Sequence, residues 1–207
     1  MDVLLASTGL ANVASVRSAF VRLGARVSVP QSPADVAAAE ALVLPGVGSM
    51  GPGMAALEQK GWAEPLRERI RTGRPTLAIC LGMQLLLAGS EEAPGGSALG
   101  IVEGCAETIP DAPRLPHFGW NQIQVDAGNG LLRAGQMYFA HSYALTLAPA
   151  GWRVAWTEHG SPLVAAMERG AVLACQFHPE LSGDAGQALL GRWLERAGVF
   201  QGEASPC

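Results

Sequence analysis

A single cysteine between two apolar segments is the feature that most restricts how this chain can fold. Residues 75–79 form a short apolar run that predicts a buried strand, and the leucine-rich run after Met83 predicts a helix. Cys80 lies between them, with the small residues Ala78 and Gly82 two positions away on either side. Small neighbours permit the sharp strand-to-helix turn of a nucleophile elbow. A helix N-terminus also favours a thiolate, because its dipole and free N–H groups attract negative charge.

Two distant segments favour a nucleophile over a structural cysteine, which is the commoner role of a buried thiol. In the segment 176–180, Gln-Phe-His-Pro-Glu, an extended backbone projects His178 and Glu180 to the same side. These side chains can act as a base and as the carboxylate that orients it. The glycine-rich turn 45–48, Pro-Gly-Val-Gly, can aim backbone N–H groups at a developing negative charge. Alone, the segment 176–180 is also typical of a surface turn, and the turn 45–48 is also typical of any exit from a strand into a loop. Together with the Cys80 segment they make three segments at predicted strand ends, which favours catalysis by Cys80.

Apolar runs and helical patterns alternate through the first half of the chain. This alternation predicts an α/β fold with a doubly wound, mostly parallel central sheet flanked by helices. The active site of such a sheet lies at the carboxyl ends of its strands. We expect strands at 3–6, 25–29, 41–44 and 75–79, and helices at 12–23, from Ser32-Pro33 onward, at 54–60 after a break at Gly51-Pro52-Gly53, and at 64–71.

From Ile101 onward, short strand-like runs separated by turns predict a mixed or antiparallel extension of the sheet in the C-terminal half. Glu91 and Glu92 precede it in a Pro/Gly-rich surface loop, where we expect a solvated acidic patch. A last helix starts at Ser182, and 201–207 are expected to form a loose tail. Without a repeat or a linker, the chain is predicted to be one domain, 1–207. The strand-like runs lie at 101–102, 108–109, 121–125, 137–140, 144–147, 153–157, 163–168 and 172–176.

The composition excludes several classes of protein. Of the 207 residues, 49% are hydrophobic and 15% charged, which is typical of a globular domain. The net charge of −4 argues against a general nucleic-acid-binding protein, and no run approaches the ~20 apolar residues of a membrane span. We expect a cytoplasmic protein with reduced thiols, since the start of the chain lacks the basic residues of a signal peptide. We expect no metal and no cofactor, because no Cys-x-x-Cys pair is formed by Cys80, Cys105, Cys175 and Cys207.

Taken together, these segments resemble the class I (triad) glutamine amidotransferases. The resemblance covers residues 1 to about 198 and is carried by Cys80-Leu81-Gly82-Met83-Gln84, by the turn 45–48 and by the segment 176–180. Two further stretches are similar to the glutaminase subunits of imidazole glycerol phosphate synthase. They are Leu115-Pro116-His117-Phe118-Gly119-Trp120-Asn121 and Tyr138-Phe139-Ala140-His141-Ser142-Tyr143.

The resemblance implies hydrolysis of the side-chain amide of L-glutamine to glutamate and ammonia. Cys80 would be the nucleophile, His178 the base and Glu180 the group that orients His178. Backbone N–H groups of Val47 and Leu81 would hold the oxyanion, and Gly46 and Gly48 would ease a rotation of the loop because glycine tolerates positive φ. As a lone histidine, His141 could also be a second base or a metal ligand. The residues that the resemblance implies for glutamine binding are Gly46, Gly48, Gln84, His141, Ser142 and Tyr143.

The resemblance also implies a partner. Water would protonate free ammonia, whose pKa is roughly 9, so a dry passage to the acceptor site is required. The implied acceptor is a (β/α)8-barrel cyclase subunit, bound in a heterodimer, which makes imidazole glycerol phosphate and AICAR from the nucleotide PRFAR in histidine biosynthesis. Aromatic side chains are enriched in interfaces, although Trp120 could equally belong to the core. The residues expected to face the partner are His117, Phe118, Trp120, Asn121 and Tyr138.

Other functions remain open at this point. They are a class I glutaminase subunit for pyridoxal phosphate or purine synthesis, a non-catalytic binding subunit, and a cysteine peptidase or γ-glutamyl hydrolase. The sequence departs from the family pattern at three places. Ala78 stands where many relatives have glycine, the first loop lacks an Asp-Tyr-Gly turn, and Leu181 replaces a residue that is often basic. The last difference argues against a charge pair with the partner at Leu181.

Overall fold

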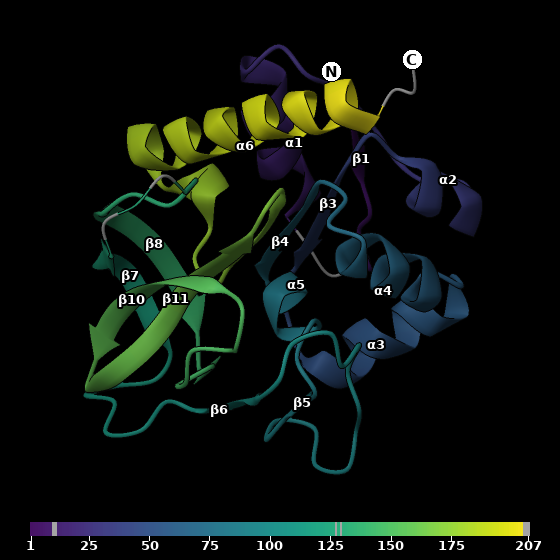
Figure 1. Cartoon of the computed structure of the whole chain (residues 1–207). Helices are drawn as coiled ribbons and strands as arrows, with labels where there is room; N and C mark the ends of the chain where they lie inside the picture. The colour runs from purple at the N-terminus through teal and green to yellow at the C-terminus, as the bar shows by residue number, and fades with distance from the viewer. Residues whose placement is uncertain (10–11, 127, 129, 205–207) are drawn as a thin grey trace.

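The computed structural model describes residues 1–9, 12–126, 128 and 130–204, and its largest element is a nine-stranded sheet (Figure 1). Neighbouring strands in the order β2-β1-β3-β4-β12 run parallel, which confirms the predicted parallel sheet. The bounds of these strands are β1 Asp2–Leu5, β2 Arg26–Ser28, β3 Ala41–Gly46, β4 Thr76–Cys80 and β12 Val172–Cys175.

The C-terminal half extends this sheet with antiparallel strands, as the sequence predicts. The order continues from β12 through β11, β10 and β7 to β8 at the edge. These strands are β7 His117–Val125, β8 Gly135–His141, β10 Arg153–His159 and β11 Ser161–Arg169. Within the described residues a small second sheet, in the order β5-β6-β9, joins Gly89–Ser90, Cys105–Thr108 and Tyr143–Ala144.

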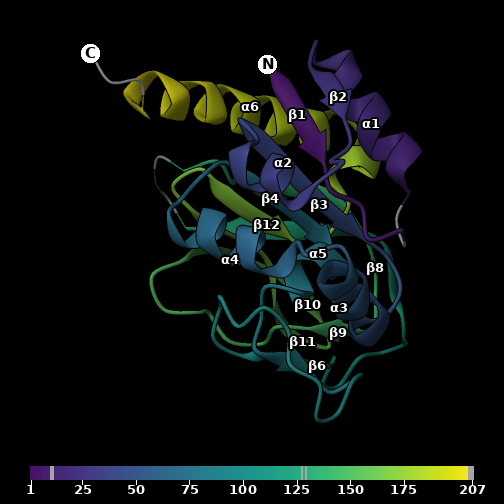
Figure 2. The ribbon, with the colours of Figure 1, turned by 90° about the vertical axis from the view of Figure 1, so that its right-hand side faces the viewer.

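Helices cover both faces of the large sheet, which makes the fold doubly wound (Figures 1 and 2). On one face α1 and the long α6 lie together, and the rings of Phe20 and Trp193 meet edge-on at 5.9 Å. On the other face α2 to α5 pack through buried residues such as Leu57 and Leu66. The helices are α1 Val13–Arg22, α2 Pro33–Ala38, α3 Met50–Gln59, α4 Ala63–Arg71, α5 Leu81–Gln84, the 3-10 helix η1 Pro179–Leu181 and α6 Gly183–Ala204.

Two helix predictions are wrong. Helix α3 begins at Met50 and includes Gly51-Pro52-Gly53, which was predicted to interrupt the chain. Proline costs little there, because N–H groups in the first turn of a helix have no intrahelical partner. Helix α5 ends at Gln84, so the leucine-rich run after the elbow is mostly not helical. Residues 85–87 are buried and pack into the core, so their apolar character reflects burial and not helical periodicity.

Three smaller differences lie in the C-terminal half. Residues 101–102 do not form a strand, and their N–H groups instead bond the Leu86 carbonyl. Strand β7 begins at His117, four residues before the predicted start at 121, so a longer part of this segment has alternating side chains. Helix α6 continues to Ala204 into the predicted tail, and 205–207 lie outside the described residues. No helix in the described ranges is long and apolar enough to cross a membrane.

Candidate active site

The three segments singled out in the sequence converge at one edge of the sheet. Strands β3 and β4 end side by side, because Gly46 pairs with Cys80. On the other side of β4, Cys175 at the end of β12 pairs with Ile79. The chain then continues from β12 to His178. The register of three parallel strands therefore brings the glycine-rich turn, the cysteine and the histidine together.

Cys80 lies on a tight turn between β4 and α5. Its φ of 54° is in the left-handed region, which is uncommon for a residue other than glycine. A Cβ at Gly82 would stand 2.0 Å from the Leu44 carbonyl oxygen, and a Cβ at Gly46 would stand 2.9 Å from the Leu81 Cβ. The turn therefore requires glycine on both neighbouring segments. Gly46, grouped from the sequence with the glutamine-binding residues, packs against the elbow.

His178 is held between a carboxylate and a sulfur. Its Nδ1 lies 2.8 Å from Glu180 Oε1, and Cys80 is near enough to raise its pKa. Burial lowers the pKa of His178, but the bonds and charges of Cys80 and Glu180 outweigh burial and raise that pKa to about 10. The imidazole therefore carries a positive charge at neutral pH beside the Cys80 sulfur. A base next to a cysteine is the arrangement of an activated cysteine nucleophile.

The raised pKa of His178 gives the stability of the fold a pH dependence with a definite sign. A group whose pKa is raised on folding stabilises the fold fully below its ordinary pKa of 6.5, and the contribution is lost as pH rises to about 10. We expect the free energy of unfolding, measured with urea, to fall from neutral pH to pH ~10 and to fall less in His178→Gln. The control His159→Gln should keep the wild-type slope. Equal slopes in wild type and His178→Gln would contradict the ion pair.

A cavity of ≈ 380 Å³ opens beside the Cys80 sulfur. Its wall includes one carboxylate, that of Glu92, which accepts a hydrogen bond of 3.0 Å from the Met50 N–H at the start of α3. The prediction of a solvated acidic patch is therefore wrong for Glu92, because the loop folds back against α3. In the sequence, the only signal that Glu92 belongs to the cavity is its position shortly after the Cys80 elbow. The cavity is lined by Val47, Gly48, Ser49, Cys80, Leu81, Gln84, Glu92, Pro116, Ala140, His141, Ser142 and Tyr143.

Side-chain amides connect the floor of this cavity to the sulfur. Gln84 Nε2 donates to the Tyr143 carbonyl at 2.9 Å and to Gln176 Oε1 at 3.0 Å. Gln176 Nε2 in turn lies 3.7 Å from the Cys80 Sγ. Gln176 is buried, and the sequence analysis predicts no role for it beyond its place in the segment 176–180. Because the Gln84 nitrogen is engaged by protein acceptors, its oxygen is the atom that remains for a ligand.

An exposed aromatic patch, formed by Phe118, Trp120 and Tyr138, adjoins the cavity. Phe118 and Trp120 are 56% and 57% exposed, and both rings contact Tyr138 on the neighbouring strand. His117 and Asn121 are also predicted to face the partner. Of these two, His117 is buried, whereas Asn121 is half-buried and its place in the interface stays a prediction. Alternation along β7 turns His117 to the opposite face, where it is only 3% exposed.

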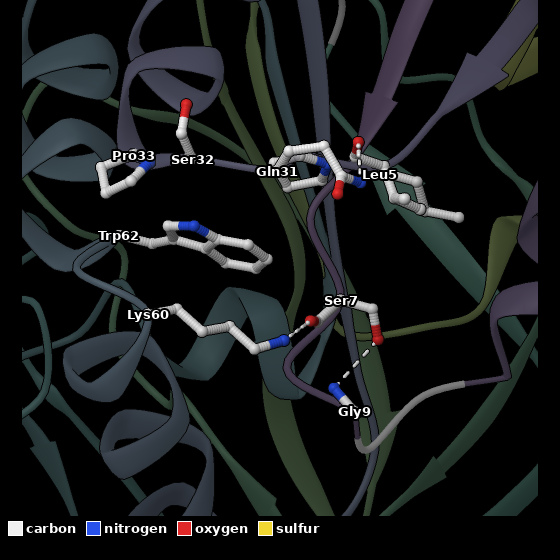
Figure 3. Close-up of a pocket in the computed structure, with 10 residues that line it drawn as sticks. Leu5, Ser7, Gly9, Gln31, Ser32, Pro33, Lys60 and Trp62 are labelled. Atoms are coloured by element: carbon white, nitrogen blue, oxygen red, sulfur yellow. Dashed lines mark hydrogen bonds between the residues drawn. The ribbon is translucent and has the colours of Figure 1, made fainter.

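A second cavity, of ≈ 480 Å³, lies at the ends of β1 and β2 (Figure 3). Several polar groups that line it form hydrogen bonds with one another. Lys60 Nζ donates to the Ser7 carbonyl at 2.8 Å and lies over the Trp62 ring, and the Gly9 N–H donates to Ser7 Oγ. We assign no chemistry to this cavity. The first loop borders it, and residues 10–11 of that loop lie outside the described residues.

In the described parts of the chain, no group of three or more His, Cys, Asp or Glu side chains could hold a metal ion. His141 is also unsuited to the role of a second base. Burial lowers the pKa of His141 to about 3, although its bond to the Tyr143 carbonyl opposes this shift. A group with so low a pKa is a weak base, and His141 stays neutral at physiological pH.

Comparison with known proteins agrees with this geometry. Residues 5–196 match the family described as glutamine amidotransferase class-I. The HisH subunit of imidazole glycerol phosphate synthase from Symbiobacterium thermophilum is 40% identical, covering 92% of each chain. The HisH subunit from Yersinia pseudotuberculosis is also 40% identical, covering 94% of this chain and 100% of its own.

Solved structures show the same fold. A crystal structure described as a glutamine amidotransferase matches this chain with a TM-score of 0.76 and 22% sequence identity. The match covers 94% of this chain and 98% of the other. The family match and the curated relatives extend over nearly the whole chain. The chain therefore belongs to the class I glutamine amidotransferases and, within them, to the family of HisH subunits.

Proposed function

We propose that the chain is the glutaminase subunit of a cytoplasmic imidazole glycerol phosphate synthase. It hydrolyses L-glutamine and passes ammonia to a (β/α)8-barrel cyclase subunit in a heterodimer. That partner converts PRFAR to imidazole glycerol phosphate and AICAR in histidine biosynthesis. The observation that carries the proposal is the contact of His178 with both Cys80 and Glu180 beside a cavity large enough for an amino acid. The 40% identity to HisH subunits supports the choice of pathway.

The proposed reaction has two halves. The Cys80 thiolate attacks the amide carbon of glutamine, and His178 gives its proton to the leaving nitrogen, so that ammonia departs and a thioester remains. His178 then takes a proton from water, which attacks the thioester and releases glutamate. Glu180 holds His178 in one orientation through both halves.

The negative oxygen formed in each half requires N–H donors. Leu81 is the first residue of α5, so its N–H lacks an intrahelical acceptor, and the residue lines the cavity. Val47 lines the same cavity directly after β3. Gly48 has a φ of 89°, a conformation that glycine adopts at little cost. We propose that Val47 and Leu81 supply the two donors, with Gly48 allowing the Val47 peptide to turn.

Glu92 is the proposed partner of the α-ammonium group of glutamine. It contributes a negative charge to the cavity wall at the start of α3. The amide end of the substrate must face Cys80, so its charged end lies elsewhere along the wall. His141, Ser142 and Tyr143 line the remaining side, where backbone groups can contact the substrate.

Replacing Glu92 with glutamine is expected to weaken glutamine binding. Glutamine keeps an oxygen for the Met50 N–H but removes the charge, and a hydrogen bond to a charged group contributes roughly 1.5–3 kcal/mol. We expect KM for glutamine to rise about 10- to 100-fold with a smaller change in kcat. The matched control is Glu91→Gln, since Glu91 is exposed and bonds the Thr108 N–H. An unchanged KM in Glu92→Gln would contradict this role.

The aromatic patch is the proposed docking surface for the cyclase. Phe118 pairs in register with Ala140, which lines the cavity, so ammonia released at Cys80 is close to this surface. Exposed aromatic side chains are the residues that contribute most to the affinity of interfaces. Leu181, which is also exposed, adds apolar area without a charge.

Trp120→Ala is expected to raise the dissociation constant of the complex with the cyclase about 30-fold, the effect of a central interface residue. Binding is measured by calorimetry with the purified cyclase. Leu147→Ala is the matched control, because Leu147 is 76% exposed and lies outside the patch. Equal dissociation constants for wild type and Trp120→Ala would place the interface elsewhere.

The function itself is tested by glutamate release from glutamine, alone and with the cyclase and its nucleotide substrate. We expect a low rate alone and strong stimulation by the loaded partner. A high rate that ignores the partner would contradict the pathway but not the glutaminase chemistry. No glutamate release in a confirmed complex would contradict the chemistry. Cleavage of peptides or γ-glutamyl conjugates would indicate a hydrolase of another kind.

A further inference from the structure

Three buried or half-buried polar side chains form a chain beneath the aromatic patch. His117 on β7 and His141 on β8 are paired in register, and His117 Nδ1 lies 3.1 Å from His141 Nε2. On the far side of His117, Asn121 Nδ2 lies 3.1 Å from His117 Nε2. At the other end, His141 Nδ1 lies 3.0 Å from the Tyr143 carbonyl oxygen. Hydrogen bonds therefore connect the three side chains and the Tyr143 carbonyl in an unbroken series.

The protons of this chain have one possible arrangement when both rings are neutral. The Tyr143 carbonyl can only accept, so His141 Nδ1 carries a hydrogen and His141 Nε2 does not. The Asn121 nitrogen can only donate, so His117 Nε2 carries no hydrogen. The bond between the rings is then donated by His117 Nδ1, and both rings are Nδ1–H tautomers.

The orientation of the Asn121 amide is fixed independently. Its oxygen accepts from the Gln122 N–H at 2.8 Å, and its nitrogen also donates to the Glu158 carbonyl at 2.8 Å. A flipped amide would place two donors together at one end and two acceptors at the other. The direction of donation therefore begins at the backbone around Asn121 and runs toward Tyr143.

The Tyr143 carbonyl is where this chain meets the catalytic cavity. The same oxygen accepts from Gln84 Nε2, which also bonds Gln176, the residue beside the Cys80 sulfur. A displaced Tyr143 carbonyl would move Gln84, which lines the cavity. Small displacements of groups that hold a substrate lower rates substantially.

We infer that Asn121 is a positioning residue, which sets the tautomers of His117 and His141 and thereby holds the Tyr143 carbonyl and Gln84 in place for glutamine. The inference rests on the proposed glutaminase function. The surroundings agree with two neutral rings. Burial and the nearby His159 lower the pKa of His117 to about 4. The His117 ring is stacked between the rings of Phe139 and His159, with centroid distances of 4.5 Å to Phe139 and 4.1 Å to His159. This stacking keeps the His117 ring in its plane.

The decisive variant is Asn121→Asp, which has nearly the same shape but replaces the donor with an acceptor. His117 Nε2 must then carry a hydrogen while Nδ1 still donates to His141, so His117 becomes an imidazolium. Besides the new carboxylate, the titratable groups in contact with His117 are His141 and His159, neither of which supplies a negative charge. We expect the pKa of His117 to rise from about 4 to neutrality or above.

The test joins a spectroscopic readout to a kinetic one. Nitrogen chemical shifts of labelled histidines should show Nδ1–H tautomers at positions 117 and 141 in wild type and a charged His117 in Asn121→Asp. With saturating cyclase, kcat for glutamate release should fall about 10- to 100-fold and its pH profile should gain an ionisation absent from wild type. The control Gln124→Glu adds the same charge to an exposed position of β7 and should change neither.

The outcomes separate this inference from the proposed function. Nε2–H tautomers in wild type would overturn the inference whatever the activity, and this measurement does not depend on the folding of a variant. An Asn121→Asp protein with an unperturbed pKa at His117, or with wild-type kcat and pH profile, would also overturn it. Correct tautomers in a wild-type protein that releases no glutamate would instead contradict the proposed function.

Discussion

Cys80→Ala is expected to abolish glutamate release, lowering kcat on the order of 10⁵-fold or more even with the cyclase bound. The Cys80 sulfur raises the pKa of His178 and is the proposed nucleophile that forms the thioester, so alanine leaves His178 with a proton but without this nucleophile. The substitution removes one atom from a nearly buried position and adds none, so the fold and the cavity should remain. The measurement is glutamate release, with circular dichroism to show that the variant is folded.

Cys105→Ala is the matched control for Cys80→Ala. Cys105 lies on β6 and is exposed, so its loss should leave kcat unchanged. Cyclase binding by Cys80→Ala should also match wild type, because the aromatic patch is intact. Residual activity near the wild-type rate would mean that another nucleophile performs the reaction, and the assignment of Cys80 would be wrong.

Gly82→Ala is expected to damage both the fold and the reaction, although the variant adds only a methyl group. That methyl would stand 2.0 Å from the Leu44 oxygen, and the atom it meets is backbone, which cannot move aside as a side chain can. Overpacking of this kind destabilises a protein by about 1–3 kcal/mol, or several degrees in Tm for a chain of this size. Relief of the clash separates β3 from α5 and with them Val47 from Leu81, so we expect kcat to fall about 100-fold.

Gly51→Ala separates this steric effect from the general cost of replacing a glycine. A Cβ at Gly51 meets nothing within 4 Å, and the residue lies in the first turn of α3. Alanine should therefore leave Tm unchanged or raise it slightly, because it favours the helix by up to about 1 kcal/mol. Thermal unfolding and glutamate release of both variants provide the comparison. Wild-type Tm and kcat in Gly82→Ala would show that the elbow can open without cost.

Local patterns in the sequence predicted the elements around the site well. The apolar run before Cys80 forms the central strand β4, and the helix predicted at 12–23 forms α1, which buries Val16, Ala19 and Phe20. Ser32-Pro33 opens α2 with a capping box as well as the proline in its first turn. These features depend on a few neighbouring residues, so a single sequence is enough to predict them.

Features that depend on distant contacts could not be predicted in this way. Glu92 belongs to the cavity because a loop folds back onto the start of α3, and nothing near Glu92 in the sequence indicates that contact. His117 was placed on the surface with its aromatic neighbours, but the strand begins early enough to turn it inward. The Gln84–Gln176 bond joins side chains 92 positions apart. Each of these depends on the packing of the whole sheet.

The central place of β4 links the chemistry of the protein to its global unfolding. Strand β4 has neighbours on both sides and lies between two cores, so its amides should exchange with solvent only when the whole sheet opens. The nucleophile at its end then cannot be disordered by local fraying. Loss of activity in denaturant should accordingly coincide with loss of the fold, and glutamate release would serve as a sensitive measure of the folded fraction in stressed or ageing preparations.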